Sequence, residues 1–169
     1  LGIPCYDSEL IQKIAEESGF AENYVKEAGE YTPGGFLSSA LSNRAFGPTN
    51  EDILWEIQCR VISELAEKGP CAIVGRCADY ILKDKNPLKI FVYADMASKI
   101  ARCRLKAPEN EHLSDHEMRK QIKRIDRNRA KYYEFYTGRK WGDKLNYDLC
   151  INTTNTEIKK IVPRIAKLF

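Results

Sequence analysis

The sequence has no long hydrophobic run, no closely spaced cysteine pair and only two histidines. No apolar stretch approaches the roughly 18 residues that a membrane span requires, and no signal-peptide pattern opens the chain, so we expect a cytoplasmic protein with no membrane partner. The six cysteines include no CxxC pair, and most lie in apolar stretches. We therefore predict that the cysteines are reduced and lie in the core. His112 and His116 have no evident third ligand, so we expect no metal site made by side chains alone.

The glycine-rich phosphate-loop motif GxxxxGK[ST] is also missing from the sequence. Gly29 and Gly34 have the required spacing, but Gly35 follows where the motif needs lysine, and Pro33 disrupts a strand-to-helix turn. The sequence therefore contains no loop of this type to hold the phosphates of a nucleotide.

What is present is the composition of an ordinary folded domain. The chain has 169 residues, of which 43% are hydrophobic and 30% are charged, so we expect a single soluble domain over residues 1–169. The net charge of +3 is compatible with an anionic substrate but does not by itself indicate nucleic acid.

Apolar runs alternate with amphipathic segments along the chain. We predict strands over 2–6, 71–74, 89–94 and 147–152, of which the last three read as strands buried on both faces. Helices are predicted between them, and the strands and helices together indicate a parallel, doubly wound α/β sheet. Asp7 or Ser8 is predicted to cap the helix 8–18, and Gly19 to end it. Thr49 with Asp52 is predicted to begin a second helix, which stops at Gly69, and Ser114 with Glu117 to begin the long basic helix. Thr156 is predicted to cap the last helix.

Polar residues follow three of the predicted strands. Arg76, Asp95 and Asn152 would lie beyond the carboxyl ends of strands, where ligands bind in sheets of this kind. By contrast, the segment 31–50 is rich in proline and glycine, which predicts a loop or a mobile insertion.

A basic cluster surrounds one acid on a long predicted helix. Asp126 can pair with Arg129 or Lys123 on the same helix face, and arginine side chains suit phosphate oxygens. Charge runs on helices are also commonly solvated surface, and spacing alone does not separate these two interpretations.

Several of these segments resemble the cytidylate-kinase-like family of bacterial P-loop kinases. The resemblance is carried by VGRCADYIL (74–82), KIFVYAD (89–95), DRNRA (126–130), RAKYYEFYTGRKWGD (129–143) and NYDLCINT (146–153), in that order, and it covers nearly the whole chain. It implies a P-loop nucleoside monophosphate kinase fold with a helical acceptor-binding insertion at about 22–50 and a lid at about 122–143.

The resemblance also implies a function and a set of site residues. The function is phosphoryl transfer from ATP, with Mg²⁺, to a small-molecule nucleotide, with cytidylate as first choice. Arg76 would meet the acceptor's phosphate, and residues 152–154 would border the adenine. By group, the implied residues are Arg129, Asp126 and Arg127 for catalysis, Arg76, Asp79 and Arg60 for substrate, and Asn152, Thr153, Thr154 and Arg124 for cofactor.

The sequence departs from the family pattern at three informative places. Cys77 stands where an acid would help to hold cytosine, and Ile122 stands where an arginine precedes the lid aspartate. The family's phosphate loop, strand and helix would precede Leu1, so we expect the natural protein to have roughly 25 to 35 more residues at this end. The sequence as given should therefore be inactive alone.

These departures leave other functions open. One alternative is a small-molecule kinase with a different anionic acceptor, and another is a nucleotide-binding regulator without turnover. Binding of RNA or DNA through the basic helix is a less favoured third, which a steep loss of affinity with salt would support. The oligomeric state is not indicated by the sequence.

Overall fold

The computed structural model describes residues 2–28, 48–106 and 113–168. The predicted loop at 31–50 therefore lies outside the described residues except for 48–50, as does His112. The described chain forms two compact units. Unit 1 contains Leu88–Arg127 and Gly142–Phe169, and unit 2 contains Gly2–Pro87 and Asn128–Trp141. The expectation of a single domain stays a prediction.

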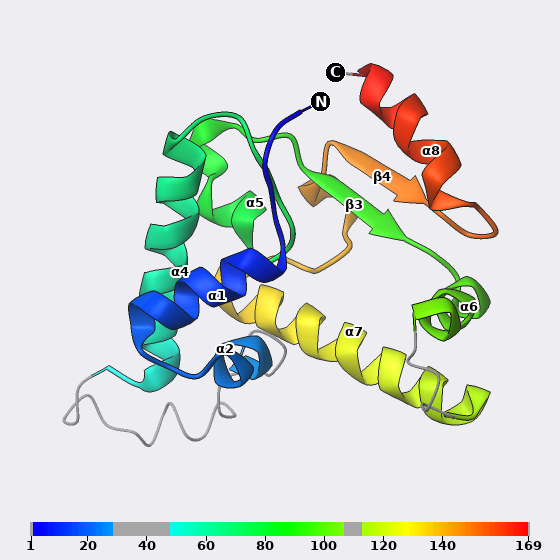
Figure 1. The fold of residues 1–169 in the computed structure, drawn as a ribbon, viewed down its shortest axis with the longest axis horizontal. Helices are drawn as coiled ribbons and strands as arrows, with labels where there is room; N and C mark the ends of the chain where they lie inside the picture. Colours follow the sequence, from blue (N-terminus) through cyan, green and yellow to red (C-terminus); the bar gives the residue numbers. More distant parts are fainter. Residues whose placement is uncertain (1, 29–47, 107–112, 169) are drawn as a thin grey trace. The chain divides into compact units, whose positions relative to one another are not determined.

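Unit 2 is mainly helical (Figure 1), and it contains one short parallel strand pair. Its elements are β1 (Cys5–Tyr6), α1 (Ser8–Ser18), α2 (Glu22–Ala28), α4 (Asn50–Glu67), β2 (Ala72–Ile73), α5 (Ala78–Ile81), the 3₁₀ turn η1 (Lys83–Lys85) and the end of α7 (Asp115–Thr137). Two predicted helix ends are confirmed. Gly19 ends α1 with a φ of 71°, and Thr49 and Asp52 form the reciprocal capping box of α4.

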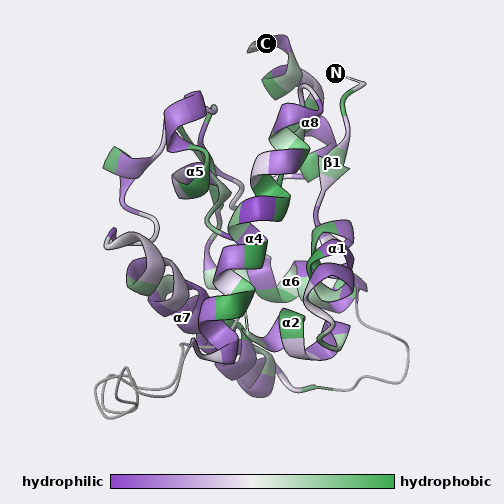
Figure 2. Ribbon diagram, turned by 90° about the vertical axis from the view of Figure 1, so that its left-hand side faces the viewer, coloured by the Kyte–Doolittle hydropathy of each residue, from purple (hydrophilic) through white to green (hydrophobic). Residues whose placement is uncertain are grey.

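The core of unit 2 is apolar and dense. Side chains from α1, α2 and α4 meet there, and Figure 2 shows hydrophobic and hydrophilic bands alternating along α4. This alternation follows from apolar residues recurring every three or four positions, which places them on one helix face. The buried cluster consists of Leu10, Ile14, Ala15, Val25, Leu54, Val61, Ile62, Leu65, Ala78 and Leu82.

Unit 1 combines a second parallel strand pair with helices. Its elements are β3 (Ile90–Tyr93), α6 (Met96–Lys106), the start of α7, the 3₁₀ turn η2 (Lys144–Asn146), β4 (Leu149–Asn152), α8 (Ile158–Ile165) and the 3₁₀ turn η3 (Ala166–Leu168). The capping box of Ser114 and Glu117 is confirmed. The predicted cap of the last helix is wrong: Glu157 precedes α8, and the Thr156 hydroxyl donates to the Thr154 carbonyl oxygen instead.

The described strands form two sheets of two parallel strands each. Cys5 pairs with Ala72 in one sheet, and Ile90 pairs with Leu149 in the other. The fold is thus α/β with short parallel sheets. The prediction that these strands are buried on both faces is wrong for β2, β3 and β4, each of which has exposed residues, because the sheets are only two strands wide in the described chain. Val74 and Val92 are 51% and 55% exposed.

The cysteines described by the structure are all free thiols, as expected. The prediction that they lie in the core holds for Cys77, which is buried, whereas Cys5, Cys103 and Cys150 are exposed. The apolar stretches that contain them are short strands and amphipathic helices, and each of these elements has an outward face.

Candidate functional site

The turn after β2 has an unusual backbone. Gly75, Arg76 and Cys77 follow one another with φ values of 74°, 55° and 56°. Residues with a Cβ rarely adopt this left-handed region, so Arg76 and Cys77 are strained and must be held by their surroundings. The turn leads directly into α5, because the Ala78 N–H donates to the Gly75 carbonyl oxygen at 3.1 Å.

A buried glutamine of α4 holds this turn. The Gln58 side chain is 3% exposed, and its amide nitrogen donates to the Arg76 carbonyl oxygen at 3.0 Å. Its amide oxygen accepts from the Tyr132 hydroxyl at 3.3 Å, and burial raises the pKa of Tyr132. The role of Gln58 was not predicted from the sequence. The feature that could have revealed it is a polar residue on the buried face of α4, between the apolar positions Leu54 and Val61.

Arg76 lines a pocket that lies within unit 2. The apolar part of its wall is formed by Ile14, Val25, Ala28 and Leu54, and its polar part by Glu51, Gln58, Arg76, Tyr132 and Tyr136. A guanidinium nitrogen of Arg76 donates to the Val25 carbonyl oxygen of α2 at 3.1 Å, which ties the arginine to the pocket wall. The residues around the pocket therefore include a cation, a carboxylate and two phenols.

Aromatic side chains pack beside the pocket. The rings of Trp55 and Tyr136 stack with centroids 4.1 Å apart, and Tyr132 and Tyr133 are buried against Cys77. Burial, and to a smaller extent the carboxylate of Asp79, raises the pKa of the Cys77 thiol to about 12. These aromatic residues of α7 pack within unit 2, whereas Phe135 of the same segment is exposed.

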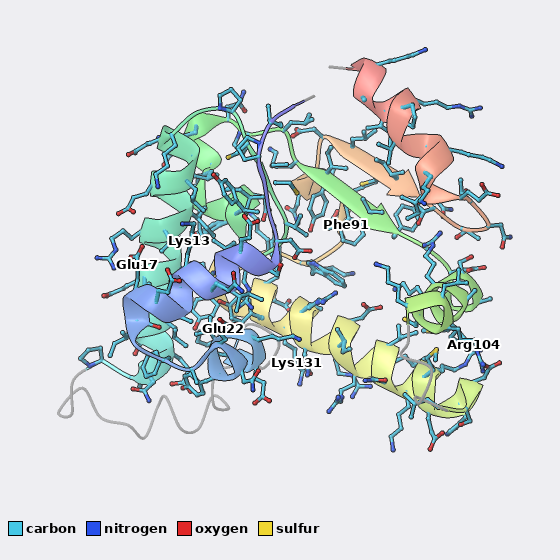
Figure 3. All side chains as sticks on the ribbon, in the orientation of Figure 1. Lys13, Glu17, Glu22, Phe91, Arg104 and Lys131 are labelled. Atoms are coloured by element: carbon cyan, nitrogen blue, oxygen red, sulfur yellow. The ribbon has the colours of Figure 1, made fainter. Side chains whose placement is uncertain are left out.

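The other predicted substrate residues have local partners. The Asp79 carboxylate accepts from the Tyr133 hydroxyl at 2.7 Å, so it fixes a tyrosine of α7. Arg60 forms an exposed ion pair at 2.8 Å with Glu17 of α1, which Figure 3 labels. Neither residue lines the pocket described above. Arg129 lies on α7 in unit 2 with an exposed side chain.

The predicted cofactor residues Asn152, Thr153 and Thr154 lie in unit 1, at the carboxyl end of β4. Asp95 is brought to the same edge, because the Thr154 hydroxyl accepts from the Asp95 N–H at 2.9 Å. The Asn152 side-chain oxygen accepts from the Thr154 N–H at 3.0 Å. Thr153 is buried, and its hydroxyl donates to the Tyr93 carbonyl oxygen at 3.0 Å.

Arg102 of α6 holds the turn that follows β4, and the sequence analysis missed it. Its guanidinium donates to the Thr153 hydroxyl at 3.0 Å and to the carbonyl oxygens of Thr153 and Thr156. An arginine in a helical run of basic residues gives no signal of its own, since its acceptors, one hydroxyl and two carbonyl oxygens, lie 51 to 54 residues away.

The acid of the basic cluster has a partner that helix spacing did not include. Asp126 pairs with Lys99 of α6 at 2.5 Å. Arg124 and Arg127 lie on α7 in unit 1 with exposed side chains.

Among the described residues, no group of three or more acidic, histidine or cysteine side chains is placed to hold a metal ion. None of the described helices combines the length and the apolar character needed to cross a membrane.

Comparisons with known proteins place the chain in a family. The sequence profile of the cytidylate kinase-like family matches residues 1–155. The crystal structure of an uncharacterized protein from Eubacterium ventriosum ATCC 27560 is similar to this chain, with 27% sequence identity, a TM-score of 0.62 and a match that covers 95% of this chain and 89% of that one. No curated protein matched the sequence. Because the profile spans most of the chain, this protein belongs to the cytidylate kinase-like family.

Proposed function

We propose that the full-length protein is an ATP-dependent phosphotransferase of the nucleoside monophosphate kinase type, with cytidylate as the first-choice acceptor. The fold proposed with it is the parallel, doubly wound P-loop sheet, of which the two short parallel sheets would be parts. Family membership supports a kinase-like function. The observation that carries the proposal for the acceptor is Arg76, a strained arginine in the turn after β2, which lines a small pocket.

In this proposal, Arg76 binds the phosphate of the acceptor. Phosphoryl transfer needs positioning and cations around the spreading negative charge more than covalent help from the protein. A guanidinium suits this role because its planar donors match phosphate oxygens. The walls of the pocket would orient the rest of the acceptor and exclude water from it.

The acceptor's base is the least constrained part of the proposal. Cys77 is a buried thiol with a raised pKa, so it stays neutral and does not replace the acid of the family pattern. Glu51 supplies a carboxylate to the pocket wall, and a carboxylate accepts hydrogen bonds from an amino group such as that of cytosine. An acceptor with another donor group would fit the same wall, which keeps a different small-molecule acceptor as the alternative.

The roles of the remaining predicted residues stay proposals. Arg129 and Arg127 would supply lid cations, and Asp126 would orient the lid through its pair with Lys99. Asn152, Thr153, Thr154 and Arg124 would border the nucleotide. ATP would supply the phosphoryl group, and Mg²⁺ would neutralise its phosphates. The described residues do not fit a magnesium ion held by protein alone, but an ion carried by a nucleotide needs only one or two carboxylates.

A coupled ADP-release assay with a panel of nucleoside monophosphates tests the proposal on the full-length protein. We expect turnover with CMP, and we expect Arg76→Ala to raise the acceptor's KM by about 100-fold, since a charge-assisted pair is worth roughly 1.5–3 kcal/mol. Arg104→Ala removes an exposed arginine that pairs with Asp115 and serves as the control. Nucleotide binding without transfer to any acceptor would support a regulator instead.

A further inference from the structure

The hydrogen bonds of Gln58 connect three segments that are distant in the sequence. Gln58 lies on α4, its donor Tyr132 lies on α7, and its acceptor is the carbonyl oxygen of Arg76 in the turn after β2. The acceptor belongs to the strained residue itself, whose φ is 55°. Gln58 therefore acts on the backbone from which the guanidinium of Arg76 extends.

Because Gln58 is buried, its hydrogen bonds are needed to offset the cost of removing its amide from water. The side chain is 3% exposed within an apolar stripe, where a polar group without partners would cost about 1–3 kcal/mol. An apolar residue would fill the same space without that risk, so packing alone does not explain the amide. What the amide supplies is a donor for the Arg76 carbonyl and an acceptor for the Tyr132 hydroxyl.

Arg76 is fixed at both of its ends. Its carbonyl oxygen is held by Gln58, and its guanidinium donates to the Val25 carbonyl oxygen of α2 at 3.1 Å. A cation held in this way loses less conformational freedom when it binds an anion, which strengthens binding. Without the bond from Gln58, the strained turn can relax toward an ordinary backbone conformation and carry the guanidinium out of place.

We propose that Gln58 is a positioning residue that sets the phosphate affinity of the acceptor pocket by holding Arg76 in its left-handed backbone conformation. This inference rests on the proposed function, because it takes Arg76 as the residue that binds the acceptor's phosphate. Tyr132 supports this role of Gln58, since the hydrogen bond from its hydroxyl orients the Gln58 amide.

Gln58→Met tests the inference because methionine keeps the length and volume of the side chain but makes neither hydrogen bond. Binding is measured on the full-length protein from its tryptophan fluorescence, to which Trp55 contributes from its stacked position on the pocket residue Tyr136. The probes are CMP and cytidine, which differ only in the phosphate. We expect Gln58→Met to weaken CMP binding by about tenfold, the effect of roughly 1.4 kcal/mol, and to leave cytidine binding nearly unchanged.

Two further variants separate positioning from general damage. Gln12→Met makes the same exchange at an exposed site on α1 and should leave the affinity for CMP unchanged. In an Arg76→Ala background, Gln58→Met should weaken CMP binding no further, because the group that it positions is gone. Equal losses for CMP and cytidine, or additive losses in the double variant, would show a merely structural role and overturn the inference.

The outcome for the wild-type protein separates this inference from the proposed function. If the wild type binds CMP but transfers no phosphoryl group, the proposed function fails while the role of Gln58 is still decided by binding. If Gln58→Met binds CMP as tightly as the wild type, the inference fails alone. If the wild type binds no nucleoside monophosphate, both are wrong.

Discussion

The two units of the chain are stabilised in different ways. Unit 2 has a large apolar cluster in which Leu10 and Ile62 are completely buried. The smaller cluster of unit 1 is Ile100, Met118 and Ile122, and the apolar side chains of β3 are largely exposed. Unit 1 relies more on polar contacts, such as those that Arg102 makes with the turn after β4. A dense core allows unit 2 to hold a strained turn, whereas directed hydrogen bonds position the loops of unit 1.

The largest expected difference between the units is in thiol reactivity. Cys77 of unit 2 is buried with a pKa of about 12, whereas Cys150 of unit 1 is exposed. At pH 8 a thiol of pKa about 12 holds roughly a thousandfold less reactive thiolate than an ordinary cysteine. We expect iodoacetamide to modify Cys77 at least that much more slowly than Cys150, as measured by peptide mass spectrometry. The difference should vanish in denaturant, and equal native rates would contradict the burial of Cys77.

The next largest effect concerns turnover. Arg129→Ala should reduce the rate of phosphoryl transfer by about 100-fold or more, because cations around the transferred group act mainly in the transition state. Its melting temperature should change little, since the side chain is exposed. Lys131→Ala, two residues further along α7 and labelled in Figure 3, serves as the matched control. Unchanged turnover in Arg129→Ala would show that the lid assignment is wrong.

Truncation of each apolar cluster compares the two cores directly. Ile62→Ala should lower the free energy of unfolding by about 3 kcal/mol or more, because the site is closed on all sides and cannot collapse fully. Ile122→Ala, in the smaller cluster of unit 1, should cost about 2 kcal/mol at the low end of the same range. Urea unfolding measures both, with the exposed Ile158→Ala as control. A larger loss for Ile122→Ala would reverse the comparison.

The polar contacts of unit 1 are tested by two arginines on the same helix. Arg102→Met removes three donated hydrogen bonds to the turn after β4 and should cost about 2 kcal/mol. Arg104→Met removes an exposed ion pair with Asp115 and should cost about 0–1 kcal/mol. Urea unfolding measures both changes. Equal costs would mean that the contacts of Arg102 contribute no more than a surface pair.

Most of the predicted helix ends are local features that the sequence revealed, with the cap of the last helix as an exception, whereas contacts between distant segments were not predictable. The αL residue Gly19 and the two capping boxes are confirmed, because each depends on residues within four positions of one another. Gln58 and Arg102 escaped prediction because their acceptors lie 18 and 51 residues away. The family was also identified correctly, since its motifs are continuous in the sequence.

The candidate site was predicted only in part, for the same reason. The position of Arg76 after a strand is a local feature, and the structure places it on a pocket wall. One partner of Asp126 is Lys99, 27 residues away on α6, which helix spacing does not reveal. The roles of the site residues in binding and catalysis stay predictions, because they depend on ligands as well as on the chain.

The two units should also respond to opposite extremes of pH. In unit 2, burial raises the pKa values of Cys77, Tyr132 and Tyr136, so the native state keeps protons that the unfolded chain loses. Their contribution to stability therefore falls as the pH rises above about 9. In unit 1, hydrogen bonds from Ser98 and Ser114 lower the pKa values of Asp95 and Glu117. Their contribution is present above about pH 4.5 and is lost as the pH falls.

The smallest expected effect is a change in this acid dependence. Glu117→Gln keeps a side chain that can accept from the Ser114 backbone but cannot titrate. Stability measured by urea unfolding should therefore fall less steeply between about pH 5 and 3 in Glu117→Gln than in the wild type, with the alkaline dependence unchanged. Glu134→Gln serves as the control, because it removes an exposed carboxylate from the same helix without changing the cap. A wild-type slope in Glu117→Gln would mean that the capping carboxylate has the same pKa in the folded and unfolded chain, and that the acid sensitivity of unit 1 arises elsewhere.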